Sequence, residues 1–532
     1  MADGEEPGSY GLRLIASSIR SGGSPSPAHR ERGLGVRVSP RPAASIRRPT
    51  PLREGLGVRA HRPLPRRRLC RRACLSTSIL ARASGIRKPG VVAGGTQRTS
   101  RVLKGFRDYL PEQMILRGRI IDRCREVFER HGFEPLDTPA IEYLEVLTGK
   151  AGENEKLMYR FVDHGGREVG LRYDLTVPLA RVVAMHQSDL ALPFKRYQIA
   201  PVWRAENPQR GRFREFWQCD ADIAGSASML ADAEVVTVMA EALAAVGLPE
   251  FTIRISHRRL LESIGLAAGV AAERATSLYR AVDKLDKIGP DGVVREMVAY
   301  DIPESAARRV LELVTATGTT DALLATLGNE LREVEGSEVP LAELGELFAA
   351  LPAFGVPQDR YVLDLALARG LDYYTGPVFE ATVTEPKVGS VGGAGRYDGL
   401  VGAFLGRPVP ATGMSLGIER IVEVVQEHGL LPVDRTVAQI VVVIFPATVA
   451  AGAGLANELR ASGFNVDLSL QPKRSVGDQL KLAGRKGIPV AVIVGESELA
   501  AGRVSLKDLR SGDQEPVARE ELVAALGRLL PA

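Results

Sequence analysis

Cysteine is scarce in this chain of 532 residues, and the few cysteines are not spaced as metal ligands. Cys70, Cys74, Cys124 and Cys219 form no Cys-x-x-Cys pair. This spacing argues against a zinc site, and we expect no metal held by the protein's own side chains. Reduced, structural thiols are expected instead, which is typical of a cytosol-like compartment.

Long apolar runs are also missing. No uninterrupted apolar stretch approaches the ~20 residues that a membrane-spanning helix needs. Apolar residues make up 45% of the chain and charged residues 25%, which is ordinary for a globular protein in water. The length predicts roughly two to four domains. We therefore exclude an integral membrane protein and expect no membrane partner.

Acidic residues are rare at the start of the chain, and this changes the meaning of the net charge of +5. Residues 1–100 hold 20 basic and five acidic residues, so this segment carries +15 and residues 101–532 carry −10. The body of the protein is therefore acidic. Any nucleic acid that it binds must be held by local basic patches rather than by the overall field.

Residues 1–100 are rich in Arg, Pro, Gly and Ser and show no sustained periodicity, so we expect this segment to be disordered. Its many arginines and few acidic residues are typical of an organelle transit peptide, but the acidic start at residues 1–6 is not typical of one. A basic arm that binds RNA and an artefactual upstream extension are open alternatives. We predict a cytoplasmic protein, or a mitochondrial or plastid one if the segment is a transit peptide.

Residues 101–432 are predicted to form an α+β domain with a largely antiparallel sheet. An amphipathic helix begins at Pro111, runs to about His131 and is capped by Gly132. Helices are also expected near residues 176–187 and 228–246. Short segments with strand-forming residues and turn signals are mixed with these helices without strict alternation. The expected strands are residues 136–141, 159–162, 169–173, 195–204, 214–224, 361–367 and 378–383.

The second half of the chain changes pattern twice. Residues 267–348 are rich in Ala, Leu, Glu and Arg with helical periodicity, which predicts a helical insertion before strands resume at Tyr361. Residues 416–428 are predicted to form a helix, and residues 430–434 a linker. Strands and helices alternate beyond it, so residues 435–532 are predicted to form a separate α/β domain.

Two polar clusters follow strand-like runs. Asp174 and Thr176 come after one run, and Thr176 is a plausible N-cap for the next helix; a plain cap without a ligand is the alternative. In residues 368–376, Arg369 can grip a phosphate or carboxylate, while Tyr373 and Tyr374 can wall a small polar ring. The alternative there is a tyrosine-rich strand with a surface ion pair.

A third cluster forms a predicted hairpin with a long basic loop, residues 207–212. Arg204 and Glu206 are two apart, as are Gln218, Asp220 and Asp222, so each set is predicted to share one face of the sheet. Unpaired polar groups in a core would each cost ~1–3 kcal/mol. The hairpin is therefore predicted to line a wet pocket, with a solvated outer face as the alternative.

A fourth cluster is rich in glycine and spans residues 389–398 and 413–420. Glycine allows the backbone to approach a flat ligand closely, although a structural bulge is its usual explanation. Arg420 lies in the predicted helix that follows, where it could stack on a purine or reach a phosphate.

Together the four clusters resemble the class II aminoacyl-tRNA synthetases, and in detail the histidyl-tRNA synthetase family. Residues 204–222 are similar to class II motif 2, and residues 413–420 to motif 3. Residues 111–139 occupy the place of motif 1, the dimer element, and residues 368–376 resemble the family's histidine signature. The resemblance covers residues 104 to about 530. It implies a class II antiparallel sheet flanked by helices and a C-terminal anticodon-binding domain.

The resemblance also implies substrates and site residues. The substrates would be L-histidine, ATP and histidine tRNA, with Mg²⁺ on the ATP phosphates, and the protein would be a homodimer. Arg369 and Arg204 would be catalytic. The histidine site would comprise Asp174, Leu175, Thr176, Gln218, Asp222, Tyr373 and Tyr374. The ATP site would comprise Arg204, Glu206, Arg369 and Arg420. The tRNA would contact Arg212, Arg214, Lys473, Arg474, Lys481 and Arg485.

The chemistry of such an enzyme agrees with these residue types. A carboxylate attacks the α-phosphorus of ATP, so positioning and neutralisation of phosphate charge are needed rather than a protein nucleophile. The rival interpretation is a synthetase-like regulatory subunit of histidine biosynthesis, and a third is an RNA-binding module on an inactive synthetase fold. Both the ATP and histidine signatures are intact here, which favours the enzyme, a histidine–tRNA ligase.

Overall fold

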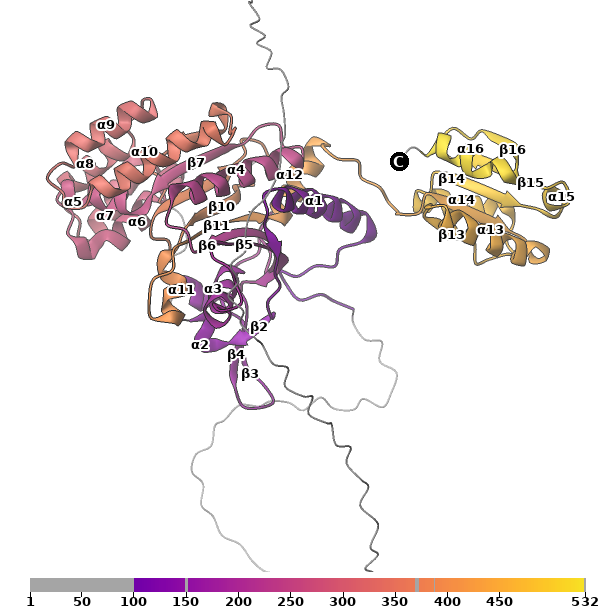
Figure 1. Ribbon diagram of the computed structural model, residues 1–532, viewed down its shortest axis with the longest axis horizontal. Helices are drawn as coiled ribbons and strands as arrows, with labels where there is room; N and C mark the ends of the chain where they lie inside the picture. Colours follow the sequence, from indigo (N-terminus) through magenta and orange to yellow (C-terminus); the bar gives the residue numbers. More distant parts are fainter. Residues whose placement is uncertain (1–99, 149–151, 369–372, 387, 531–532) are drawn as a thin grey trace, which may run out of the picture. The chain divides into compact units, whose positions relative to one another are not determined.

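The computed structural model describes residues 100–148, 152–368, 373–386 and 388–530 (Figure 1). Its main element is an eight-stranded sheet with the strand order β1-β5-β6-β11-β10-β9-β7-β8. All neighbouring pairs from β5 to β7 are antiparallel, whereas β1 and β8 pair in parallel at the edges. The predicted α+β fold with a largely antiparallel sheet is confirmed. The strands are β1 (Glu134–Pro135), β5 (Phe194–Trp203), β6 (Glu215–Ala224), β7 (Thr252–His257), β8 (Tyr361–Leu363), β9 (Pro377–Thr382), β10 (Ser390–Arg396) and β11 (Ala411–Gly417).

Helices α1 (Pro111–Arg130), α4 (Met229–Ala245) and α12 (Ile418–His428) bury their apolar sides in the core on one face of this sheet. Helix α1 begins at the predicted proline, whose fixed φ suits the first turn of a helix. It ends before Gly132, whose φ of +74° turns the chain out of the helix.

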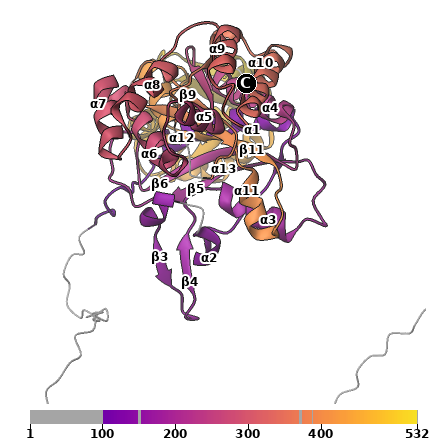
Figure 2. The same ribbon diagram turned by 90° about the vertical axis from the view of Figure 1, so that its left-hand side faces the viewer.

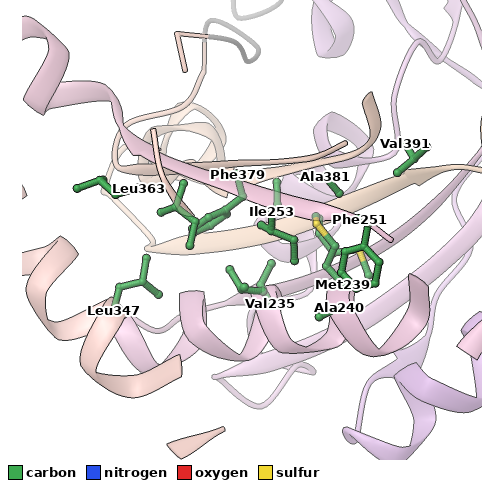
Figure 3. Close-up of a cluster of buried hydrophobic side chains, with 14 of the residues drawn as sticks. Val235, Met239, Ala240, Phe251, Ile253, Leu347, Leu363, Phe379, Ala381 and Val391 are labelled. Carbon is green, nitrogen blue, oxygen red and sulfur yellow. The ribbon is translucent and has the colours of Figure 1, made fainter. Parts of the chain in front are cut away.

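The centre of that core lies between helices α4 and α10 (Glu338–Ala353) and strands β7 and β9 (Figure 3). Val235 and Met239 of α4 and Leu347 of α10 are completely buried there. They face Ile253 and Phe379 of the sheet (Figure 3). Burying each such side chain contributes roughly 1.5–3 kcal/mol. One face of the sheet is therefore fixed, which leaves the opposite face for a polar site.

The chain between β7 and β8 is helical, as predicted, although its first helix begins at Arg258 and its last ends at Ala353. Helices α5 to α10 gather beside the end of the sheet that carries β7 and β8, in both views (Figures 1 and 2). Helix α7 contains a kink at Gly289, whose φ is +69°. The helices not yet bounded are α5 (Arg258–Ala267), α6 (Ala275–Val282), α7 (Leu285–Ala299), α8 (Glu304–Val314) and α9 (Thr320–Glu330).

A small three-stranded sheet, ordered β2-β4-β3, carries the segment that leads into the site (Figure 2). Its strands are β2 (Ile141–Tyr143), β3 (Arg160–Val162) and β4 (Glu168–Leu171). Helix α2 (Leu144–Leu147) packs against it and shares a second core with α3 (Thr176–Met185) and α11 (Asp398–Leu405). Tyr173, Tyr373 and Tyr397 are buried in this core, which places their hydroxyl-bearing rings next to the main sheet.

The C-terminal part forms a five-stranded sheet, ordered β13-β12-β14-β15-β16. Helices α13 (Val449–Ala461) and α16 (Leu522–Leu529) belong to the core on one face, and α14 (Val476–Lys486) to the core on the other. The strands are β12 (Ile440–Ile444), β13 (Val466–Leu468), β14 (Val490–Val494), β15 (Arg503–Asp508) and β16 (Gln514–Ala518). The predicted C-terminal α/β fold is confirmed; β16 and the short helix α15 (Glu496–Ala500) were not predicted.

Several predicted strands differ from the structure. The predicted strand 136–141 is wrong up to residue 140, because β1 ends at Pro135 and β2 begins only at Ile141. Between them the Asp137 carboxylate accepts from the Thr138 amide, a local bond that competes with strand pairing. The apolar run 361–367 is a strand only to Leu363, since Asp364 accepts from the Ala366 amide and turns the chain. In the described ranges, every helix is too short or too polar to span a bilayer.

Candidate active site

The face of the main sheet opposite α1 and α4 is hollowed by a cavity of about 1300 Å³. Cys219 and Ala221 of β6 point into the core with α1, so the alternating residues Gln218 and Asp222 point to the cavity face. The sequence prediction that these two side chains share one face of the sheet is thereby confirmed, and both line the cavity. The predicted site residues that line the cavity are Thr176, Arg204, Glu206, Arg212, Gln218, Asp222, Tyr373, Tyr374 and Arg420.

The strand register arranges polar side chains in a row across this face. Asp220 of β6 lies opposite Ser415 of β11, Ser415 lies opposite Gly393 of β10, and Gly393 opposite Glu380 of β9. The Gln218 amide donates to the Ser415 hydroxyl at 2.8 Å. Such a row cannot serve as an apolar core, so the floor of the cavity is built to hydrogen-bond a ligand.

The glycines of β10 and β11 make room for side chains of the protein as well as for a ligand. A Cβ at Gly395 would lie 2.8 Å from the Tyr374 ring, and one at Gly413 would overlap the Asp222 carboxylate. At Gly393, in contrast, a Cβ would meet nothing within 4 Å. The close approach expected of a flat ligand thus has space at Gly393, whereas Gly395 and Gly413 serve the protein's own tyrosine and carboxylate.

Asp222 lines one end of the cavity, and two further carboxylates, Asp174 and Asp220, are buried close to it. Asp174, Asp220 and Asp222 expose 1–2% of their surface, and Arg196 beside them is completely buried. Burial raises the pKa of Asp174 to about 6 and that of Asp220 to about 8, while the Arg196 charge opposes both shifts. Burial also raises the pKa of Asp222, again against Arg196. This acid cluster can hold a cationic ligand that replaces the lost water.

The start of helix α3 differs from the prediction. Thr176 was predicted as its N-cap, but Thr176 is the first helical residue and Leu175, without a side-chain cap bond, precedes it. Asp174 takes the capping role, since its Oδ1 accepts from the Val177 amide at 3.1 Å. The other Asp174 oxygen is buried and has no hydrogen-bond partner among the described residues. Asp174 is therefore held by one oxygen and can bind with the other.

Three tyrosines wall the acid cluster. The Tyr373 ring lies 5.1 Å from the Tyr374 ring and 5.8 Å from the Tyr397 ring, both edge to face. The Tyr397 hydroxyl donates to Asp222 Oδ1, which fixes that carboxylate. Burial raises the pKa of all three phenols, so they stay protonated donors near neutral pH.

Arginines occupy the other end. Arg204 Nε donates to the Tyr173 carbonyl at 2.9 Å, and its guanidinium lies over the Phe216 ring, 5.1 Å from the centroid. Arg204 and Glu206 were predicted to share a strand face, but β5 ends at Trp203, so period-2 spacing does not apply to them. Both nevertheless line the cavity. Glu206 forms an ion pair with Arg212 at 3.2 Å.

Arg420 joins the arginine end from helix α12. It donates to the carbonyls of Gly211 and Ser390. Burial, followed by the nearby charge of Arg212, lowers its pKa, so an anion beside it would be strongly favoured. The basic loop is held against the same helix, because the Gly211 amide donates to Glu423 and Arg210 pairs with Glu427 at 2.5 Å.

The cavity therefore has an acidic, tyrosine-walled end and an arginine end on one antiparallel sheet. Comparison with known proteins identifies the family. A family model described as histidyl-tRNA synthetase matches residues 105–421, and one described as anticodon binding domain matches residues 439–529. The chain belongs to the histidyl-tRNA synthetase family.

Relatives and solved structures support this family assignment. A histidine–tRNA ligase from Aeropyrum pernix is 45% identical, covering 83% of this chain and 100% of the relative. A histidine–tRNA ligase from Rhodopirellula baltica is 43% identical, covering 79% of this chain and 95% of the relative. Histidyl-tRNA synthetase from Nostoc sp. PCC 7120 superposes with a TM-score of 0.73 at 35% identity, covering 82% of this chain and 100% of that one.

Four predicted residues of the histidine, ATP and acceptor-end sites are not part of the described cavity wall. Asp174 and Leu175 lie at the start of α3, next to Thr176, which does line it. Arg369 of the histidyl-tRNA synthetase signature lies outside the described residues, so its role stays a prediction. Arg214 does not line the cavity; its guanidinium donates to the backbone carbonyls of Glu206 and Lys104. These contacts make Arg214 a brace for the basic loop, and its contact with tRNA also stays a prediction.

The sequence predicted no role for three residues that the structure places in or against the acid cluster: Arg196, Tyr397 and Asp220. Arg196 and Tyr397 both contact Asp222, the first as an ion pair at 2.9 Å. Asp220 was placed on the correct face but given no role. Arg196 is paired with Asp222 only through the β5–β6 register, and Tyr397 reaches it from the start of α11. A strand pairing drawn from the hairpin could have indicated Arg196, whereas Tyr397 lies in the predicted glycine-rich cluster but was given no role there.

In the part that matches the anticodon-binding model, basic side chains lie on and before α14. Lys473, Arg474, Lys481 and Arg485 are exposed. Buried Gln479 of α14 donates to the carbonyls of Ile444 and Arg474, which fixes the segment before the helix. We name Lys473, Arg474, Lys481 and Arg485 the α14 patch.

Proposed function

We propose that this chain is a histidine–tRNA ligase. It activates L-histidine with ATP to histidyl-adenylate and transfers the histidyl group to the 3′ end of histidine tRNA, a step of protein biosynthesis. The family and its relatives support this activity. The residue roles below are our inference from the geometry.

The observation that carries the proposal is an excess of hydrogen-bond acceptors at the acid end. Asp222 Oδ2 forms an ion pair with Arg196, whereas buried oxygens of Asp174, Gln218 and Asp220 have no hydrogen-bond partner among the described residues. Each such group costs about 1–3 kcal/mol when it is left unpaired. A ligand with several N–H donors relieves this cost, and histidine brings an ammonium group and an imidazole N–H. An apolar amino acid would leave acceptors unpaired, which supplies specificity.

Within this pocket the two ends of histidine are held by different elements. Asp174 and Thr176, with the backbone at Leu175, hold the ammonium group at the start of α3. Gln218 and Asp222 complete the pocket from β6, and Tyr373 and Tyr374 contact the imidazole. The carboxylate of histidine then faces the arginine end.

At the arginine end, ATP is held by Arg204 at its α-phosphate and by Arg420 nearer the terminal phosphates. In the first step a histidine carboxylate oxygen attacks the α-phosphorus, a C(O)–O–P bond forms, and pyrophosphate leaves with the electrons of the broken P–O bond. Arg204 and Arg369 neutralise charge that develops on the α-phosphate. In the second step the terminal ribose hydroxyl of tRNA attacks the carbonyl carbon, and AMP leaves.

Mg²⁺ on ATP fits the carboxylates of this end. Glu206 and Glu380 line the cavity, and both lie close enough to Arg420 for their negative charges to raise its pKa. Either carboxylate would therefore bind a cation that the ATP phosphates also coordinate. The ion would supply charge neutralisation on the phosphates. In the described ranges no cluster of three or more His, Cys, Asp or Glu side chains forms a metal site of its own.

The tRNA would contact the chain at two places. The basic loop, with Arg212 exposed and Arg214 as its brace, would meet the acceptor end. The α14 patch would meet the anticodon region, because it offers positive charge on an otherwise acidic body. In this scheme residues 101–432 are the catalytic domain, residues 435–532 the anticodon-binding domain, and residues 1–100 an added extension.

The active form would be a homodimer in the cytoplasm. Ile141, Tyr143, Phe161 and Val162 of the small sheet are exposed apolar side chains, and Met114 is exposed on α1 in the motif 1 segment. Exposed apolar patches of this kind mark protein–protein contacts. The described cysteines, Cys124 and Cys219, are free and buried, which suits a reducing compartment.

Histidine-dependent exchange of pyrophosphate into ATP tests the activation step. We expect exchange with L-histidine and none with leucine or phenylalanine. A folded protein that binds histidine without exchange would support the regulatory-subunit alternative instead. A structure described as an ATP phosphoribosyltransferase regulatory subunit/histidyl-tRNA synthetase from Bacillus halodurans shares this fold, with a TM-score of 0.62 at 26% identity.

A further inference from the structure

Arg196 has no place among the histidine and ATP contacts above, yet it is one of the largest completely buried side chains of the chain. It lies in β5, directly opposite Asp222 of β6 in the strand register. Burial of a guanidinium is costly unless charge partners surround it. Its position in the acid cluster therefore requires an explanation.

The guanidinium links two parts of the amino-acid pocket. Its Nη2 lies 2.9 Å from Asp222 Oδ2 and donates to the Leu175 carbonyl at 3.0 Å. Leu175 stands between Asp174 and Thr176, at the start of α3. One side chain thus ties the carboxylate of β6 to the backbone segment that would hold the ammonium group.

Arg196 is also the completely buried positive charge among three buried carboxylates, Asp174, Asp220 and Asp222. Its Nε and Nη1 have no hydrogen-bond partner among the described residues, so it acts on the carboxylates largely through charge. Burial raises the pKa of Asp222, and Arg196 is the strongest opposing influence, ahead of the Tyr397 hydroxyl.

We propose that Arg196 is a positioning residue for the amino-acid pocket. It keeps the Asp222 carboxylate charged and aimed at the imidazole N–H, and it fixes the Leu175 backbone so that Asp174 and Thr176 meet the ammonium group. This assignment rests on the proposed function, because it names a determinant of histidine binding in the same site.

The first readout is the division between KM and kcat in pyrophosphate exchange. Arg196→Met removes the charged contacts that align Asp222 with the Leu175 backbone. KM for histidine should therefore rise about 10–100-fold. KM for ATP should change less than about twofold, because Arg204 and Arg420 do not contact Arg196. A loss shared equally by both substrates would point to general damage.

The second readout is the pH profile of kcat/KM for histidine. Other groups that face Asp222 are Asp174, Asp220, Tyr374 and Tyr397. Removing Arg196 takes away the main influence that lowers the Asp222 pKa, so Asp222 would take up its proton at a higher pH. The acid limb of the profile should therefore move to higher pH in Arg196→Met. The titration of free histidine is common to both enzymes and cancels in the comparison.

Arg196→Lys and Arg181→Met complete the experiment. Arg196→Lys keeps the charge, so its acid limb should stay in place while KM for histidine rises about five- to tenfold from lost geometry. Arg181→Met removes a partly buried ion pair with Glu142, 2.6 Å long and away from the cavity, and controls for lost stability alone. Both of its KM values should be unchanged.

The outcomes separate the two proposals. A wild-type protein without exchange would overturn the proposed function itself. An active wild type whose Arg196→Met variant keeps its KM for histidine and its acid limb, like Arg181→Met, would overturn the role of Arg196. If Arg196→Met does not fold, Arg196→Lys decides alone, and an unchanged KM for histidine would overturn the role.

Discussion

Gly413 lies directly opposite Asp222 in the β11–β6 register, and a Cβ on Gly413 would lie 1.9 Å from Asp222 Oδ1. The carboxylate therefore occupies space that only glycine leaves free. This close approach lets Asp222 rest against the sheet beneath the tyrosines, where Arg196 and Tyr397 both reach it.

Gly413→Ala should abolish histidine binding because the added methyl displaces the Asp222 carboxylate. We expect kcat/KM for histidine in pyrophosphate exchange to fall at least about 100-fold, as expected when a buried charged hydrogen bond is lost. Gly399→Ala is the matched control, since a Cβ there meets nothing within 4 Å and Gly399 does not line the cavity. Normal histidine kinetics in Gly413→Ala would contradict this account of the acid cluster.

Asp174→Asn should make the protein more stable and less active. Burial raises the pKa of Asp174 to about 6, so the folded state favours the protonated carboxyl group. The stability that this group contributes at low pH is lost as the pH rises through about 6. At pH 8 the asparagine variant should therefore be more stable by about 1–3 kcal/mol. Asparagine can still accept from the Val177 amide and keep the helix cap.

Thermal unfolding of wild type and Asp174→Asn at pH 5 and pH 8 measures this effect. The gain in midpoint should be larger at pH 8, while histidine-dependent exchange falls at both pH values because the ammonium group loses its ionic partner. A variant that is equally stabilised at both pH values, or that keeps full exchange, would refute the role of the Asp174 carboxylate.

Arg204→Met should lower turnover without removing histidine. Loss of one donor to a developing charge typically costs about 10²–10³ in kcat. Histidine alone should still raise the unfolding temperature, because the acid cluster is unchanged. Arg204→Lys keeps the charge but loses the planar fork and should be intermediate. If the methionine variant lost histidine binding in step with turnover, Arg204 would belong to the amino-acid pocket instead.

Replacing the α14 patch with alanines should weaken charging of tRNA and leave pyrophosphate exchange unchanged. Each lost phosphate contact should also make the salt dependence of KM for tRNA less steep, by about 0.7–0.9 in the logarithmic slope. The double-alanine variant of Lys481 and Arg485 removes two of these charges. Its matched control replaces Arg519, just before α16, and Arg528 of α16, the helix that packs on the other face of the sheet. Equal effects of both variants would show that only net charge matters.

The fold and the predicted site residues that line the cavity could be inferred because their signals are local. Alternation in β6 placed Gln218 and Asp222 on one face, and Pro111 and Gly132 marked both ends of α1. Strands β10 and β11 were not predicted, because glycine is a poor strand former and their register depends on neighbours. The Thr176 cap was wrong because the residue two before it, Asp174, competes for the same amide.

The acid cluster could not be completed from sequence, since its members meet only through long-range pairing. Arg196 has the pattern of an ordinary polar strand residue, and only its register with Asp222 reveals its role. Tyr397 reaches the same carboxylate from the start of α11, 175 residues away in sequence. Burial, which sets the pKa of Asp174 and Asp220, is likewise a property of the assembled sheet.

The central claim is that one cavity joins histidine to tRNA, and charging of a histidine tRNA transcript tests it most directly. With purified full-length protein, ATP, Mg²⁺ and labelled histidine, we predict ATP-dependent accumulation of histidyl-tRNA that Gly413→Ala abolishes and Gly399→Ala does not. No label on the transcript, from protein that is folded and binds histidine, would contradict the account.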